Sequence, residues 1–261
     1  MSASSTTVSE SALGHFHPTL RRWFQEAFPT PTAAQQLAWP AIAGGASTLL
    51  LAPTGSGKTL AAFLVAIDRI MFTPSGDMKN KGVRVLYVSP LKALGVDVER
   101  NLRSPIAGVR AAAERDGIAY HLPTVGVRSG DTPSSERHRL TREPPEILIT
   151  TPESLYLILT SRARDTLRTI ETVIVDEIHS LVGTKRGSHL FLSLERLEAL
   201  RRAEKPDGQP LQRIGLSATQ RPLEEVARLL GGAEATGDPN QPSQPRAVQI
   251  IEAGRGKQLD L

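Results

Sequence analysis

The sequence predicts an α/β domain in which helices flank a mostly parallel central sheet, and three observations carry this prediction. Short β-rich runs alternate with helical stretches along most of the chain, an order typical of a parallel sheet with crossover helices. Runs such as Thr48–Leu51, Ile147–Ile149 and Val173–Val175 are apolar almost throughout, as in strands buried on both faces. No period of roughly 20–50 residues repeats, which argues against a solenoid.

The individual elements follow in order along the chain. Residues 1–14 begin with a run rich in serine and threonine and are expected to form a mobile tail. Residues 18–45 have a helical pattern with breaks expected at Pro29, Pro31 and Pro40. The expected strands are Thr48–Ala52, Val83–Ser89, Pro123–Val127, Glu146–Thr150, Thr172–Val175 and Gln212–Leu216. The expected helices lie near 58–72, 91–113, 133–141, 152–168, 187–204 and 222–231.

Composition excludes several classes of protein. The 261 residues include no cysteine, which excludes disulfides, iron–sulfur clusters and cysteine-ligated zinc. No uninterrupted apolar run approaches the roughly 18 residues of a membrane-spanning helix, and the start of the chain lacks the pattern of a secretory signal. We therefore expect a cytoplasmic protein without a membrane partner. The net charge of +4 is compatible with a polyanionic partner and does not require one.

A phosphate-binding loop is the strongest local signal. Between an expected strand and an expected helix the sequence is Ala52-Pro53-Thr54-Gly55-Ser56-Gly57-Lys58-Thr59. The two glycines allow successive backbone N–H groups to face one concavity at a helix start, where phosphate oxygens bind. Lys58 is placed to reach the β- and γ-phosphates, and the Thr59 hydroxyl to bind Mg²⁺. The alternative is a glycine-rich turn before a helix, and Ala52 replaces the first glycine of the usual pattern.

Two carboxylates supply the second half of a nucleotide site. The buried run Val173–Val175 leads directly into Asp176-Glu177-Ile178-His179, which puts both acids at the carboxyl edge of the sheet, where ligands of open α/β folds bind. Asp176 is expected to hold Mg²⁺, and Glu177 to orient and deprotonate the attacking water. A solvated acidic turn after a strand is the alternative. The order of the two motifs favours the catalytic interpretation, with Lys58 as a third catalytic group.

Together these motifs resemble the first RecA-like domain of superfamily 2 DExH-box helicases, a P-loop NTPase fold. The resemblance rests on Gly55–Thr59, on Asp176–His179 and on Ser217-Ala218-Thr219 after an apolar strand. It implies that Phe28–Gln35 is the adenine-reading segment, in which the Gln35 amide binds the adenine edge and Phe28 lies near the base. Core packing is the alternative for Phe28. The resemblance also implies that Thr54, Gly55, Ser56 and Gly57 contact the phosphates.

The exact residues within and around these motifs resemble those of the bacterial large helicase-related (Lhr) proteins. The segments that carry this closer resemblance are Ala38–Pro40, Ala52–Phe63, Tyr87–Leu94, Arg128–Thr132 and Asp176–His179. It implies an ATP-driven 3′→5′ translocase that acts on single-stranded DNA or RNA.

Three further segments resemble the strand-binding motifs of these helicases, and each follows an expected strand. They are Ser89–Leu94, Gly126–Thr132 and Thr150–Leu155. The contact residues implied by the resemblance are Pro90, Lys92, Arg128, Thr151 and Ser154, in positions suited to phosphate contact without base reading. Helix capping is the local alternative, since a threonine followed by proline is a common helix start.

A coupling element is implied between the nucleotide site and the strand path. Hydroxyls of Ser217 and Thr219 are expected to hydrogen-bond His179 and the carboxylates. A serine and threonine turn at a strand end explains the same local sequence.

The resemblance also implies a second RecA-like domain, with arginine fingers, as the partner of this one. We expect the motor domain to span residues 15–232, and residues 233–261 to form a linker and the start of the absent second domain. Such an isolated first domain should bind nucleotide weakly, hydrolyse it poorly and not unwind duplex, because arginine fingers contribute about 10³–10⁵ in rate. Two other hypotheses are a non-motor, nucleic-acid-stimulated NTPase and a binding platform without catalysis.

Overall fold

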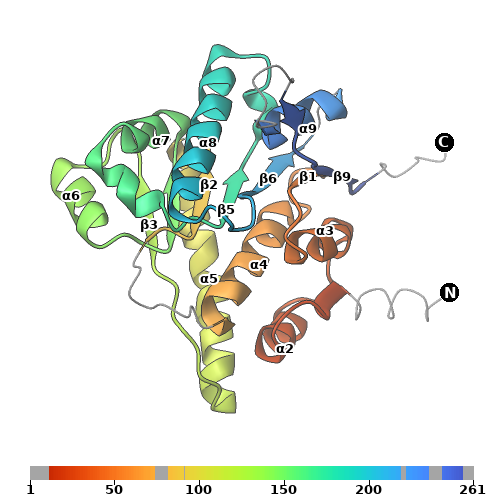
Figure 1. Ribbon diagram of the computed structural model, residues 1–261. Coiled ribbons are helices and arrows are strands. Elements are labelled where there is room, and N and C mark those ends of the chain that lie inside the picture. Colours follow the sequence, from red (N-terminus) through yellow and green to blue (C-terminus); the bar gives the residue numbers. More distant parts are fainter. Residues whose placement is uncertain (1–11, 74–81, 91, 219–221, 235–242, 255–261) are drawn as a thin grey trace.

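A seven-stranded parallel sheet forms the centre of the molecule, as described by a computed structural model (Figure 1). The structure describes residues 12–73, 82–90, 92–218, 222–234 and 243–254, without the side chains of 92–96. The strand order is β3-β4-β2-β5-β6-β1-β9, and every pairing between these neighbours is parallel. The predicted fold class is therefore confirmed.

Strands and helices alternate as the sequence predicts. The strands are β1 Thr48–Leu51, β2 Val85–Val88, β3 Val125–Arg128, β4 Ile147–Thr150, β5 Thr172–Val175, β6 Gln212–Ser217 and β9 Gln249–Glu252, with a separate antiparallel pair β7 Ala233–Glu234 and β8 Gln244–Pro245. The helices are α2 Pro18–Ala27, α3 Ala33–Ala43, α4 Lys58–Phe72, α5 Lys92–Asp116, α6 Ser134–Arg142, α7 Pro152–Leu159, α8 Lys185–Glu204 and α9 Leu223–Gly231, with 3₁₀ turns η1 Arg162–Leu167 and η2 Ile178–Ser180.

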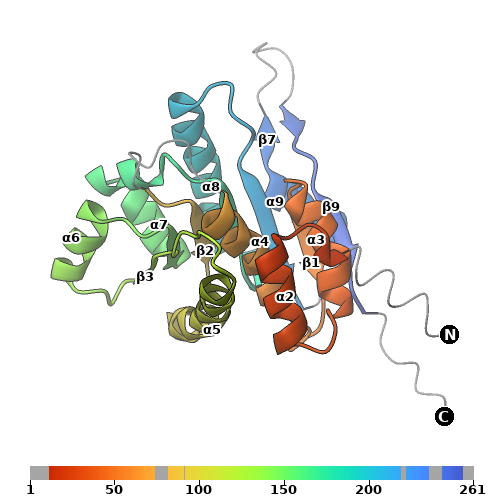
Figure 2. The ribbon, with the colours of Figure 1, turned by 90° about the horizontal axis from the view of Figure 1, so that it is seen from below.

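Two hydrophobic clusters cover the two faces of the sheet, and the helices that contribute to them are drawn in Figures 1 and 2. One contains apolar side chains of α2, α3, α4 and α5, and the other those of α7, α8 and α9. Alternate strand residues serve opposite faces: Tyr87 joins the first cluster, whereas Leu86 and Val88 join the second. This double burial explains the continuous apolar runs in the strands.

Four details differ from the sequence prediction. Ala12 and Leu13, expected to belong to a mobile tail, are buried in the first hydrophobic cluster. Helix α3 continues through Pro40, because the neighbouring Trp39 and Ile42 are buried and hold this last turn on the core. The helix expected over 152–168 is divided into α7 and η1, where the Ser161 hydroxyl caps the second segment by accepting from the Ala163 N–H. Strand β9 pairs with β1, so the sheet extends beyond the boundary expected at residue 232.

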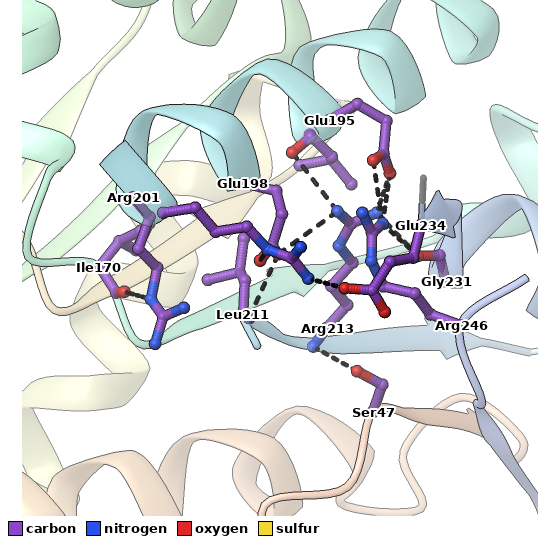
Figure 3. A network of polar contacts seen from close by, with 12 residues as sticks. Ser47, Ile170, Glu195, Glu198, Arg201, Leu211, Arg213, Gly231, Glu234 and Arg246 are labelled. Atoms are coloured by element: carbon purple, nitrogen blue, oxygen red, sulfur yellow. Dashed lines mark hydrogen bonds and ion pairs between the residues drawn. The ribbon is translucent and has the colours of Figure 1, made fainter. Parts of the chain in front are cut away.

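Buried charged side chains gather at the amino end of the sheet, where β6 begins (Figure 3). Arg213 is fully buried, and its Nη1 donates to Glu195 Oε1 at 2.7 Å and to the carbonyl oxygens of Leu230 and Gly231. Glu198 is also buried and accepts from Leu211 N and from Arg202. We call the set Glu195, Glu198, Arg201, Arg202, Arg213, Glu234 and Arg246 the amino-end cluster.

No helix among the described residues is both long enough and apolar enough to cross a membrane.

Candidate nucleotide and nucleic-acid site

The phosphate-binding loop joins β1 to α4 at the carboxyl edge of the sheet. Gly55 and Gly57 both have φ +79°, a left-handed conformation that glycine adopts without steric cost. A Cβ atom on Gly57 would lie 2.9 Å from Gln35 Nε2, so a larger residue at this position would displace the Gln35 amide. Gly57 caps α4 without any side-chain hydrogen bond, which leaves the first N–H groups of that helix directed toward the loop.

Lys58 and Ser56 are buried polar groups with few protein partners. The Lys58 side chain is 5% exposed, and its ammonium has one hydrogen bond, a long one of 3.5 Å to the Pro53 carbonyl oxygen. The Ser56 hydroxyl oxygen is buried without a hydrogen-bond partner. Buried donors of this kind normally have hydrogen-bond partners. An anion bound between the Lys58 ammonium and the Ser56 hydroxyl would supply partners for both groups.

The upstream segment packs directly on this loop. The Thr32 hydroxyl donates to the Ser56 carbonyl oxygen at 2.7 Å and accepts from Gln35 N, while Gln35 Oε1 accepts from Thr32 N at 2.9 Å. This reciprocal capping box starts α3, and its Thr-x-x-Gln spacing is visible in the sequence. Gln35 is buried beside Gly57, and the half-buried Phe28 ring packs on Phe24 at 4.7 Å.

Asp176 follows β5 and lies beside β2, the neighbouring strand. Its side chain is 6% exposed; Oδ1 accepts from Glu177 N at 2.9 Å, and Oδ2 accepts from the Tyr87 hydroxyl. Burial, reinforced by the Asp176 charge, raises the pKa of Tyr87 above its ordinary value. Sequence reasoning included Tyr87 in a motif and did not give it a role.

Glu177, His179 and Ser217 form a short chain of polar contacts. His179 Nδ1 lies 3.2 Å from Glu177 Oε2 and 3.3 Å from the Ser217 hydroxyl. Glu177 has φ +45° and is the one non-glycine residue with positive φ in the described part of the chain. Such backbone strain is found most often at functional sites. Thr219, the other expected coupling residue, lies outside the described residues.

The oxygen donors present fit Mg²⁺. Each Asp176 carboxylate oxygen accepts one hydrogen bond from the protein and therefore retains a lone pair for a cation. Thr59, in the first turn of α4, adds a hydroxyl. Among the described residues, no group of three or more His, Cys, Asp or Glu side chains is arranged to hold a metal ion. One carboxylate and one hydroxyl suit an ion that takes its other ligands from water and phosphate.

The expected strand-contact residues on α7 are capping residues in the fold. Thr151 is the N-cap of α7, and its hydroxyl accepts from Ser154 N at 3.3 Å and donates to Ser154 Oγ at 3.2 Å. Both side chains are buried. The structure thus brings these two residues together at a helix start, where free backbone N–H groups can also face a phosphate.

The other expected strand contacts lie at the carboxyl edge of neighbouring strands. Arg128 ends β3 and is half-buried; burial, with a smaller contribution from Arg137, lowers the pKa of its guanidinium. Pro90 is buried just after β2. Lys92 begins α5, and its side chain lies outside the described residues.

Arg186, at the start of α8, joins two of these segments. Its Nη1 donates to the Pro90 carbonyl oxygen at 2.7 Å, and its Nε and Nη2 donate to the two Glu153 carboxylate oxygens, the latter at 3.0 Å. The hydrogen bond from Arg186 lowers the pKa of Glu153 to about 2. Sequence reasoning missed Arg186, because nothing local in Lys185-Arg186-Gly187 indicates a partner so far away in the chain.

The chain matches the family model described as DEAD/DEAH box helicase over residues 32–227. It is 57% identical to an Lhr helicase of Mycolicibacterium smegmatis over 88% of this chain and 15% of that protein. It is 54% identical to the Lhr helicase/uracil glycosylase of Escherichia coli over 83% of this chain and 14% of that protein. The chain thus spans about one seventh of the length of these relatives.

A solved structure resembles the whole described fold. The structure of Mycobacterium smegmatis helicase Lhr bound to ssDNA and AMP-PNP superposes with a TM-score of 0.81 at 54% identity, over 92% of this chain and 28% of that chain. With its phosphate-binding loop, its Asp-Glu-Ile-His turn and this match over most of its length, the chain belongs to the DEAD/DEAH box helicase family.

Proposed function

We propose that the chain is the first motor domain of an Lhr-like helicase that binds ATP with Mg²⁺, contacts the backbone of single-stranded DNA or RNA, and moves 3′→5′ along it. The domain is taken to include the core residues Ala12 and Leu13 and to extend through β9, which pairs with β1, and its partner is taken to be a second RecA-like domain of the parent chain. We also propose that the protein is located in the cytoplasm.

The buried Lys58 ammonium carries the proposal. A lysine that is 5% exposed with one long hydrogen bond is an unfavourable arrangement unless an anion completes it. The glycine turn and the uncapped start of α4 surround it with further donors. The triphosphate of ATP satisfies all of these groups, and the ssDNA- and AMP-PNP-bound relative supports that ligand.

The remaining residues have distinct roles in this proposal. Asp176 and Thr59 hold the metal that accompanies ATP and neutralises charge on its phosphates. Glu177 orients and deprotonates the attacking water, Gln35 reads the adenine edge, and Phe28 lies near the base. The hydroxyls of Ser217 and Thr219 with His179 connect this site to the strand path.

Contacts to nucleic acid in this proposal are contacts to its backbone. Pro90, Lys92, Arg128, Thr151 and Ser154 follow β2, β3 and β4 at one edge of the sheet. A row of helix starts, hydroxyls and positive charge binds phosphates without reading bases.

Nucleotide binding by the 261-residue chain and by Lys58→Ala tests the ATP site. In titrations of a fluorescent ATP analogue with Mg²⁺, wild type should bind weakly, and Lys58→Ala should lose binding by at least about 100-fold because a buried cation is removed from the phosphates. Lys205→Ala, an exposed lysine just after α8, is the matched control. Unchanged binding by Lys58→Ala refutes the site.

Catalysis by this chain alone is expected to be poor, since the second domain supplies groups worth about 10³–10⁵ in rate. ATP-dependent strand displacement by the isolated chain would contradict this division of labour. In a full-length parent, ATP hydrolysis should rise when single strands are added. If it does not rise, a non-motor NTPase or a binding platform is the better description.

A further inference from the structure

Tyr87 is a buried tyrosine at the nucleotide site that the proposed roles above leave without a task. It lies in the middle of the sheet on β2, and its side chain is completely buried. The sequence offers three tyrosines, and the other two, Tyr120 and Tyr156, lie at the surface or near it.

The Tyr87 hydroxyl donates to Oδ2 of Asp176, whose other oxygen accepts from the Glu177 N–H. Both carboxylate oxygens are therefore oriented by protein donors. One donor is the hydroxyl of Tyr87 in β2, and the other is the backbone N–H of Glu177, the residue after Asp176. A carboxylate held at both oxygens has little rotational freedom and presents its remaining lone pairs in fixed directions.

Tyr87 is itself held by the helix that carries the phosphate-binding loop. Its ring stacks on Phe63 of α4, with 5.0 Å between ring centroids and 28° between planes, and Phe63 is 1% exposed. Backbone bonds fix the same strands, since Asp176 N donates to the Val88 carbonyl oxygen at 3.0 Å. The tyrosine thus connects the helix of Lys58 and Thr59 with the carboxylate of Asp176.

We propose that Tyr87 is a positioning residue that orients the Asp176 carboxylate toward the metal of a metal–nucleotide complex. This inference rests on the proposed ATP site and adds a residue that acts on the metal rather than on the phosphates. Loss of the hydroxyl frees the carboxylate to rotate, so metal-dependent binding weakens while metal-free binding is retained.

The test compares Tyr87→Phe with wild type in titrations of the fluorescent ATP analogue at a series of Mg²⁺ concentrations and in EDTA. The Mg²⁺ concentration that gives half of the metal-dependent gain in affinity should rise about tenfold, the scale of a hydrogen bond to a charged group. Affinity in EDTA should stay within about twofold of wild type. A variant with wild-type Mg²⁺ dependence overturns the inference.

Tyr120→Phe is the matched control. The Tyr120 hydroxyl also donates to a carboxylate, Glu114 Oε1 at 2.8 Å, on an exposed helix end away from the loop. The same chemical change there should leave the Mg²⁺ dependence unchanged. If Tyr120→Phe shifts it equally, the effect on Tyr87→Phe is a general loss of stability and the inference fails.

A second measurement needs no substitution at Tyr87. In wild-type chain labelled with 3-fluorotyrosine, the three ¹⁹F resonances are assigned with Tyr120→Phe and Tyr156→Phe. The Tyr87 resonance should move when Mg²⁺ is added to the nucleotide-bound chain and stay still when nucleotide is added in EDTA. A Tyr87 resonance that does not shift when Mg²⁺ is added overturns the inference. Absence of nucleotide binding by the wild-type chain overturns the proposed function itself.

Discussion

The two ends of the parallel sheet differ in whether a buried cation has a carboxylate partner within the chain. At the amino end, Arg213 is paired with Glu195 and with backbone carbonyl oxygens (Figure 3). At the carboxyl end, Lys58 is buried with a single long hydrogen bond and no ion pair to a described residue. Both ends exclude water from charged groups, but only the amino end supplies the counter-charges from within the chain.

This difference separates stability from function. Buried charges that the protein itself pairs are costly to break, because removing one partner leaves another uncompensated. A buried charge that the protein leaves without a counter-charge is a cost to the folded state that a ligand removes. The pKa of Glu195 reflects the first case: burial raises it and the hydrogen bonds from Arg246 and Arg213 lower it, with a net value below the ordinary one.

The largest expected effect follows from breaking the amino-end cluster. Arg213→Ala removes the cation that contacts Glu195 and lies 3.7 Å from Glu198, and it leaves a cavity. We expect the free energy of unfolding to fall by about 3–5 kcal/mol, measured by urea denaturation followed by circular dichroism. Nucleotide affinity of the remaining folded protein should not change.

Two variants bracket this expectation. Arg103→Ala removes an arginine that is 74% exposed and paired with Glu99, and it should change stability by less than about 0.5 kcal/mol. Lys58→Ala at the carboxyl end should leave stability unchanged or slightly higher, although we expect it to weaken nucleotide binding by at least about 100-fold. If Lys58→Ala destabilises the domain as much as Arg213→Ala, the contrast between the two ends is wrong.

The carboxyl end was far more predictable from the sequence than the amino end. Gly55, Gly57 and Lys58 form a contiguous motif, and Asp176 follows a recognisable buried strand, so local sequence was sufficient. The contacts of Arg213 join β6 to α8 and to the end of α9, and those of Arg186 join α8 to α7 and β2. Such pairings depend on strand order and helix packing, and no local pattern reports them.

The fold itself was predictable because its strands are buried on both faces. Apolar runs identified β1, β4 and β5 but gave neither the register nor the order of the strands, and β3 and β9 are only partly buried. Pro40 and Ser161 were less predictable, since tertiary packing keeps one turn helical through a proline and a serine cap restarts another after α7. Strand β9 was expected only as the possible start of a further strand, because three of its four residues are exposed and carry little pattern.

A half-buried carboxylate outside the amino-end cluster gives an effect of intermediate size that depends on pH. Asp68, on α4, accepts from His17 N at 3.0 Å, and burial raises its pKa to about 6, against smaller opposing effects of that hydrogen bond and of Arg69. Because the folded-state pKa is raised, its contribution to stability is full below the unfolded value of 3.8 and is lost as pH rises through about 6.

Asp68→Asn should therefore be more stable than wild type at pH 8, by about 1–2 kcal/mol after allowance for solvent screening, and equal to it at pH 4. The asparagine oxygen can still accept from His17 N. Thermal unfolding at both pH values measures this, with Asp207→Asn, in the exposed loop before β6, as control. Equal gains at both pH values would show that ionisation is not the cause.

A small effect on stability, and the sharpest test of the carboxyl end, is expected for Arg186→Ala. The Arg186 and Glu153 side chains are 39% and 56% exposed, so their pair should contribute less than about 1 kcal/mol to folding. Its consequence should instead appear in strand binding, because Arg186 holds Pro90 beside the start of α7. We expect affinity for a fluorescein-labelled oligodeoxythymidylate, measured by anisotropy, to fall about three- to tenfold.

Salt dependence separates positioning from direct contact. A residue that contacts a phosphate contributes about 0.7 to the slope of log affinity against log salt for single strands. Arg128→Ala should therefore flatten that slope by about this amount, whereas Arg186→Ala should weaken binding at every salt concentration with the slope unchanged. Arg139→Ala, whose partner Glu136 lies on the same exposed helix, should do neither. A flattened slope for Arg186→Ala would make it a phosphate ligand, and the paired charges at this edge would then belong to the ligand site rather than to its support.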